Sequence, residues 1–159
     1  MDELTEQQLE TRAVWKSIEG SNALLEIYGY YPTLHDACIV GIDVYFEGRQ
    51  LTAAIEYSDL VETEGRDKDN RVTKATKIIM RWNGVAEANV RIHGNDVYHL
   101  SFSKKGGKIA TDLISGWGVS GTIVADFIEV VSIQDSDRDS YPDKNSYLHT
   151  INFRLGELA

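Results

Sequence analysis

The chain has 159 residues, of which 42% are hydrophobic, so it is long enough to bury one core and too apolar for a disordered protein. Its 25 acidic residues outnumber its 16 basic residues and give a net charge of −9, which argues against nucleic acid or an anionic membrane as a direct ligand. An acidic surface favours a cationic partner, although such charge also serves solubility alone. We expect a single domain over residues 1–159.

The start of the chain predicts its compartment. It is acidic and polar, where a secretory signal needs a basic segment and an apolar run. No stretch approaches the roughly 18 uninterrupted apolar residues of a membrane-spanning helix. Cys38 is the single cysteine, so an intramolecular disulfide is impossible. These features predict a cytoplasmic protein.

Two helices are predicted at the N-terminus. Residues 2–18 are rich in Glu, Leu and Gln, carry apolar residues near helical spacing, and are followed by Gly20. Ser21 is placed to cap the start of a second helix over residues 22–28, and Gly29 is placed to cap its end. The helical part of the domain therefore covers residues 2–29.

From residue 37 onward, apolar residues alternate with a period of two, which is typical of strands with one buried face. Asn83-Gly84 is the strongest hairpin signal among the connecting turns. Short sequential connections favour antiparallel neighbours, because parallel strands need long crossovers. The predicted strands are residues 38–46, 51–57, 73–82, 85–93, 97–103, 121–133 and 147–155.

Together these elements predict an α+β fold. The two N-terminal helices are expected to pack on one curved, mostly antiparallel meander of about seven strands over residues 37–155. Trp15 and Trp82 fall on apolar faces and are predicted to lie in the core. Trp117 lies between two glycines, and this setting is compatible both with a core residue and with an exposed anchor for a partner.

The sharpest local motif is Tyr31-Pro32-Thr33-Leu34-His35-Asp36-Ala37. A His beside an Asp is compatible with acid–base or metal chemistry, but adjacent residues of an extended chain point to opposite sides. No HxH, HExxH or CxxC spacing supplies further metal ligands. We favour a structural role, in which His35 and Asp36 tie the helix-to-strand junction to nearby backbone groups.

Residues 135–143 carry acids at alternate positions, like the start of a calcium loop. The sixth position is Ser140 where a calcium loop has Gly, and the twelfth is Ser146 where it has Glu, so we expect an exposed loop without metal. Cys38 lies in no setting that would lower a thiol pKa, and residues 118–121 match GxSxG only superficially. We therefore predict no enzymatic activity and no cofactor.

Several stretches follow one family pattern: Trp15 and Ile18, then residues 24–29, then the motif at residues 31–37. In this order they resemble the immunity protein 50 family of bacterial polymorphic toxin systems. Residues 81–85 and 89–92 are similar to a hairpin of the same family, with Trp82 where Phe is expected. The resemblance implies a cytoplasmic protein that neutralises a cognate toxin by direct binding, and the net charge favours a basic toxin domain.

The residues expected to bind such a partner are acids and aromatic residues of the polar loops: Glu62, Glu64, Asp67, Asp69, Trp117, Asp135, Asp137, Asp139 and Tyr141. Two alternatives remain open. One is a small metal-dependent hydrolase that uses His35, Asp36 and residues 135–143. The other is a structural subunit that self-associates through an exposed sheet edge.

Overall fold

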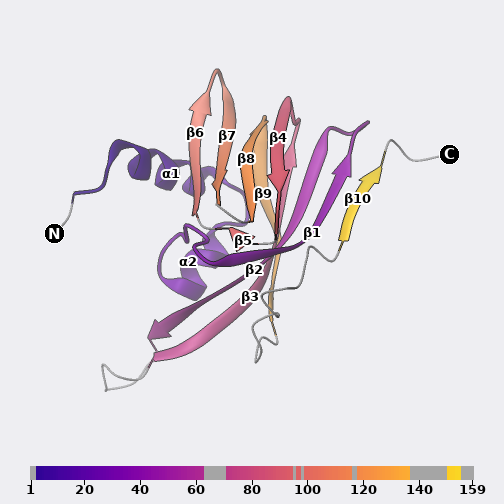
Figure 1. The fold of residues 1–159 in the computed structure, drawn as a ribbon. Coiled ribbons are helices and arrows are strands. Elements are labelled where there is room, and N and C mark those ends of the chain that lie inside the picture. Colours follow the sequence, from indigo (N-terminus) through magenta and orange to yellow (C-terminus); the bar gives the residue numbers. More distant parts are fainter. Residues whose placement is uncertain are drawn as a thin grey trace.

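The computed structural model describes residues 3–62, 71–94, 96–97, 99–115, 118–136 and 150–154. These residues form helices α1 (Glu6–Ser17) and α2 (Asn22–Tyr28) and two β-sheets, which confirms the predicted α+β class (Figure 1). The prediction of one meander is wrong, because the strands are divided between two sheets. No helix in the described ranges is long and apolar enough to span a membrane.

The larger sheet, here called sheet A, has the strand order β10-β1-β2-β3-β9, and β5 pairs with one end of β1. Its pairings are antiparallel except for the parallel pairing of β1 with β10. Its strands are β1 (Ala37–Tyr45), β2 (Gln50–Glu62), β3 (Arg71–Asn83), β5 (Asp96–Val97), β9 (Phe127–Asp135) and β10 (Thr150–Arg154).

The smaller sheet, sheet B, is antiparallel throughout and has the order β4-β8-β7-β6. Its strands are β4 (Glu87–Ile92), β6 (His99–Lys105), β7 (Lys108–Ile114) and β8 (Val119–Ala125). α1 lies along β6, at one side of this sheet (Figure 1). The long β2–β3 hairpin of sheet A extends past α2 and away from the rest of the molecule (Figure 1).

Two of the places where the chain passes from one sheet to the other lie next to each other. Asn83-Gly84 does not form the predicted hairpin, because β3 pairs with β2 and β9 while β4 pairs with β8. Gly84 has φ +64°, and a Cβ atom there would overlap the carboxylate of Asp126. The backbone N–H of Asp126 donates to the Asn83 carbonyl at 2.9 Å. Asp126 also separates β8 from β9, so the predicted single strand over residues 121–133 is two strands in different sheets.

The helix boundaries agree with the sequence analysis except at the first turn. α1 begins at Glu6, where Thr5 and Gln8 form a reciprocal capping box. α2 has its predicted bounds, and Gly29 ends it with φ +80°. Ser21 precedes α2 as predicted, but its hydroxyl donates to the Trp15 carbonyl at 2.6 Å and does not cap the helix.

Large aromatic side chains hold the two sheets and α1 together. Trp15 and Trp82 are each 1% exposed, which confirms that both belong to the core. Trp15 packs edge-on against Phe102 of β6, and the Trp82 indole N–H donates to Thr111 Oγ1 of β7 at 2.9 Å. The Trp82 bond joins sheet A to sheet B. Trp117 lies outside the described residues.

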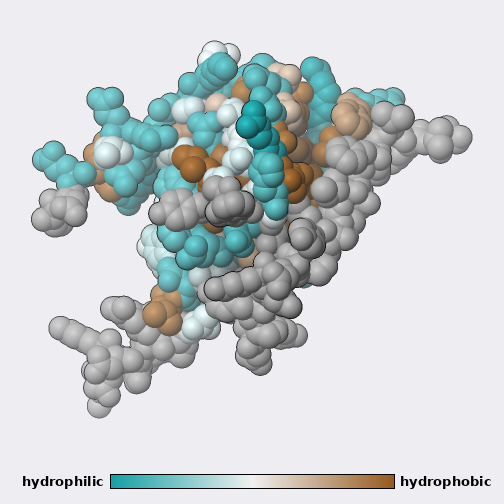
Figure 2. Space-filling view, viewed as in Figure 1, coloured by the Kyte–Doolittle hydropathy of each residue, from teal (hydrophilic) through white to brown (hydrophobic). Residues whose placement is uncertain are grey.

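An apolar cleft of about 290 Å³ lies between the two sheets. Its inner wall is buried and includes Ile55 of sheet A and Ile123 of sheet B. Its lip is formed by exposed residues, among them Phe46 after β1 and Ile92 at the end of β4. Figure 2 shows apolar side chains at the surface on this side of a largely hydrophilic molecule.

Candidate functional site

The motif at residues 31–37 anchors the chain to the core and then turns it. Pro32, Leu34 and Ala37 are buried, so these three positions specify the fold. Leu34 has φ +60° and Asp36 has φ +62°, and the Ala37 N–H donates to the Leu34 carbonyl at 3.0 Å. Asp tolerates this left-handed conformation better than most residues do. A structural role for Pro32, beside those of His35 and Asp36, stays a prediction.

The left-handed backbone at Asp36 brings the neighbouring side chains together. His35 Nδ1 lies 3.0 Å from Asp36 Oδ2, and the two side chains are 51% and 73% exposed. The expectation that these side chains point to opposite sides is wrong, because it assumed an extended backbone. The pair therefore presents an imidazole and a carboxylate on the surface, side by side.

His35 and Asp36 open onto a polar hollow of about 360 Å³, here called the recess. Most of its lining residues belong to the β2–β3 hairpin, which Figure 1 shows continuing beyond α2. Its other walls come from the distal part of β2 and the start of β3. The lining residues are His35, Asp36, Tyr57, Ser58, Asp59, Leu60 and Thr73.

Three tyrosines support one wall of the recess. The Tyr30 hydroxyl donates to Asp59 Oδ2 and lies 3.0 Å from the Tyr57 hydroxyl, which is itself 3.4 Å from Asp59 Oδ2. Tyr28 is held beneath them, because its hydroxyl lies 2.6 Å from Thr76 Oγ1. Two phenols are thus directed at one carboxylate, which fixes Asp59 at the edge of the recess.

Burial raises the pKa of two of these tyrosines, Tyr57 and Tyr28. Burial, followed by the neighbouring Tyr28, raises the pKa of Tyr57 to about 12. Burial also raises the pKa of Tyr28, against the opposing effect of its hydrogen bond to Thr76. A phenol with a raised pKa is a poor base and a poor nucleophile. Tyr57 therefore stays protonated at neutral pH and donates its hydrogen bond to Asp59.

The raised pKa of Tyr57 predicts a loss of stability in alkali. The folded state holds the Tyr57 proton more tightly than the unfolded chain does. The protonated phenol therefore contributes its full share to the free energy of unfolding below pH 10, and this share is lost as the pH rises towards 12. We expect the free energy of unfolding to fall by on the order of 1–2 kcal/mol more in the native chain than in Tyr57→Phe between pH 8 and 11.5. Urea denaturation at both pH values measures this, and equal losses in the two proteins would contradict it.

Asp135 lies in the same row of side chains as the recess. Residues paired directly across antiparallel strands share a face, and the register places Asp59 opposite Lys74 and Thr76 opposite Asp135. Lys74 Nζ lies 2.6 Å from Asp135 Oδ1. Asp59, Lys74 and Asp135 therefore form one charged row. The row lies on the core-facing side of sheet A, near the end of the strands.

The structure describes only part of the predicted binding set. Glu62 ends β2, and nothing is described of its side chain. The other predicted residues lie outside the described ranges: Glu64, Asp67, Asp69, Trp117, Asp137, Asp139 and Tyr141. Sequence reasoning missed Tyr30, Tyr57 and Asp59. The signal for Tyr57 and Asp59 was the period-two pattern of β2, which continues past residue 57.

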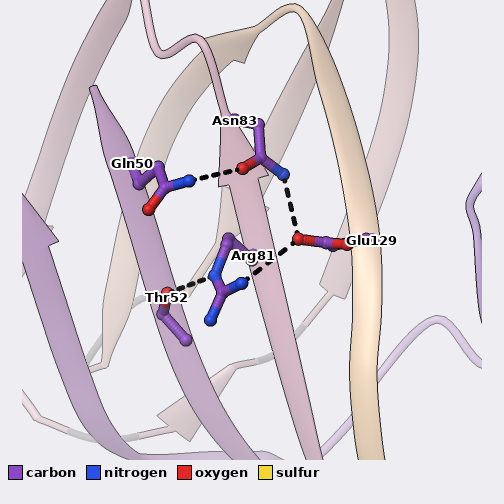
Figure 3. Close-up of polar contacts among 5 residues, drawn as sticks. All are labelled: Gln50, Thr52, Arg81, Asn83 and Glu129. Atoms are coloured by element: carbon purple, nitrogen blue, oxygen red, sulfur yellow. Dashed lines mark hydrogen bonds and ion pairs between the residues drawn. The ribbon is translucent and has the colours of Figure 1, made fainter. Parts of the chain in front are cut away.

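A second polar cluster occupies the opposite face of sheet A (Figure 3). Arg81 contacts Glu129 at 3.4 Å and Thr52 at 3.3 Å, while Asn83 bridges Gln50 and Glu129 at 3.0 and 3.3 Å. These groups bond one another across three adjacent strands. The cluster therefore fastens β2, β3 and β9 together and is not a candidate binding site.

The search for a metal centre beside the recess covers the described part of the chain. No group of three His, Cys, Asp or Glu side chains there is placed to hold a metal ion. Cys38 is buried, with its Sγ 3.6 Å from Asp96 Oδ1. The chemistry that the recess offers is negative charge, hydrogen-bond acceptors and aromatic surface.

The fold and the recess define an α+β protein of two sheets with an acidic, tyrosine-supported hollow at the end of one hairpin. Comparison with protein-family models, with curated proteins and with solved structures finds no match to this chain.

Proposed function

We propose that this chain is an immunity-type protein that neutralises a cognate bacterial toxin by direct protein–protein binding. The observation that supports this most is the recess, in which the carboxylates of Asp36 and Asp59 lie beside exposed apolar surface. Tyr30 is 39% exposed and Leu60 is 54% exposed, and both adjoin Asp59. Tyrosine is among the residues enriched in protein-binding hot spots, so the exposed Tyr30 beside this acidic hollow supports a binding role.

The chemistry of the recess fits a basic side chain of the partner. A Lys or Arg that enters it would meet two carboxylates and could pack against the Tyr30 ring, an arrangement that adds cation–π attraction. The net charge of −9 would speed the encounter with a basic toxin domain. Asp135 is already paired with Lys74, so in this proposal it borders the acidic edge without adding free charge, and the predicted acids outside the described ranges remain candidate contacts.

The direct test is isothermal titration of the chain with the toxin domain encoded immediately upstream of its gene. We expect one-to-one binding with a nanomolar dissociation constant that weakens as the salt concentration is raised from 50 to 500 mM, about the range over which surface charges become screened. Lysozyme, a basic protein without a relation to the system, serves as the control for non-specific attraction. Absence of heat with the toxin domain, or equal binding of lysozyme, would overturn the proposal.

A further inference from the structure

The outer edges of strands β6, β9 and β4 differ in what covers them. β6 is covered: the Phe102 N–H donates to Thr11 Oγ1 at 3.0 Å and the Lys104 N–H donates to Glu10 Oε1 at 2.8 Å, both on α1. The edge of β9 is also covered, because the Val130 N–H donates to the Glu19 carbonyl at 2.7 Å. β4, in contrast, pairs with β8 alone within the described ranges. Folded proteins usually protect such an edge.

The open edge of β4 is suited to pairing with another strand. The His93 N–H donates to the Gly118 carbonyl at 2.9 Å, on the β8 side. Because hydrogen-bonded pairs alternate along an antiparallel ladder, the backbone groups of Ala88, Val90 and Ile92 face the open edge. The side chains of the same three residues line the apolar cleft, and Ala88 and Ile92 are exposed.

The other face of β4 carries charges of both signs. Glu87, Asn89 and Arg91 are exposed, and no salt bridge to Glu87 or Arg91 is found among the residues that the structure describes. Glu87 and Arg91 are symmetrically placed, two residues before and two residues after Asn89. A strand with this pattern is complementary in charge to an antiparallel copy of itself.

We propose that β4 pairs antiparallel with β4 of a second copy of this chain, about a two-fold axis at Asn89. Glu87 then lies opposite the partner's Arg91, and Arg91 opposite the partner's Glu87, so that both charges are matched twice. Ala88 lies opposite the partner's Val90, and these two form the hydrogen-bonded pairs. The charged pairs fall at the non-hydrogen-bonded positions, where facing side chains are closest.

This pairing would join the two copies of sheet B into one continuous sheet across an isologous interface. It would also satisfy the open backbone edge and cover the apolar lip formed by Ala88 and Ile92. None of the residues of the recess takes part in this pairing. The test of the dimer is therefore independent of the test of toxin binding.

Charge reversal tests the register. We expect sedimentation equilibrium of the native chain between 1 and 500 μM to show a monomer–dimer equilibrium. Glu87→Arg or Arg91→Glu places two like-charged pairs in the interface, and each variant should weaken dimerisation by about tenfold or more, ~1.4 kcal/mol. The double variant Glu87→Arg/Arg91→Glu restores both pairs and should recover dimerisation to within about threefold of the native chain, or ~0.7 kcal/mol.

Lys105→Glu, an exposed reversal at the end of β6, is the matched control and should leave the equilibrium unchanged. Circular dichroism of each variant separates loss of pairing from loss of folding. A native chain that stays monomeric throughout, or a dimer that neither single reversal weakens, would overturn the proposal. The proposal would also be overturned if the double variant dimerised no more tightly than the single variants.

Discussion

Replacing Trp82 by alanine is expected to lower the free energy of unfolding by about 4 kcal/mol, within the range for deleting a buried aromatic side chain. Trp82 is 1% exposed and projects from β3 towards sheet B. The substitution leaves a cavity between the two sheets and removes the hydrogen bond from the indole N–H to Thr111 Oγ1. Urea denaturation at pH 7 measures the loss, and a cost below about 1 kcal/mol would contradict the central place given to this residue.

Two milder variants separate packing from hydrogen bonding. Trp82→Phe keeps a ring in the core but loses the indole N–H, and Thr111→Val keeps the shape of the acceptor residue but loses its hydroxyl. Each should cost about 1–3 kcal/mol, because it leaves a buried polar partner unsatisfied. The double variant should cost less than the sum of the two single ones. Strict additivity in this double-mutant cycle would show that the contact between the sheets carries no energy of its own.

The helices could be predicted because their signals are local. Gly29 adopts the left-handed conformation that ends α2, as its position after an apolar turn indicated. The predicted capping role of Ser21 is wrong, because a hydroxyl can bond any nearby carbonyl and that of Ser21 donates to the Trp15 carbonyl. For α1 the capping box of Thr5 and Gln8 places the start four residues later than predicted from residue 2.

The strands could be predicted as elements, but their assembly could not. Asn83-Gly84 marks a tight turn, yet a turn does not decide which strand comes next to β3. That choice depends on β9, more than forty residues later, whose pairing places Met80 opposite Val130 in the core. β7 was missed because Lys108, Thr111 and Asp112 interrupt its apolar pattern, although Thr111 is buried as the acceptor for Trp82.

The recess was only partly visible in the sequence. The motif at residues 31–37 drew attention to His35 and Asp36, but the positive φ of Asp36, which brings their side chains together, leaves no signature beyond the residue type. Tyr30 and Asp59 are 29 positions apart, and their hydrogen bond exists only once α2 has packed on β2. Local patterns identify the members of such a site, and tertiary packing alone assembles them.

Neutralising the two carboxylates of the recess is expected to have the largest effect on partner binding. Asp36→Asn and Asp59→Asn keep the size of each side chain, and Asn tolerates the left-handed backbone at residue 36. Each removes an acceptor charge for a basic side chain of the toxin and should weaken binding by about tenfold to a hundredfold, or 1.4–2.7 kcal/mol. Because the charges screen with salt, the difference from the native chain should shrink as salt is added.

Glu47→Gln supplies the matched control. Glu47 is an exposed acid in the turn between β1 and β2, at the opposite end of β2 from Asp59. The substitution Glu47→Gln changes the net charge by the same amount as either recess variant but removes no group from the recess. Its affinity for the toxin domain should stay within about threefold of the native value, ~0.7 kcal/mol.

The most direct test of the central claim is therefore a titration of the double variant Asp36→Asn/Asp59→Asn with the toxin domain, beside the native chain and Glu47→Gln. The account predicts that the double variant binds at least about a hundredfold more weakly, ~2.7 kcal/mol, while Glu47→Gln binds like the native chain. If the double variant bound with native affinity, the recess would not be the toxin-binding site.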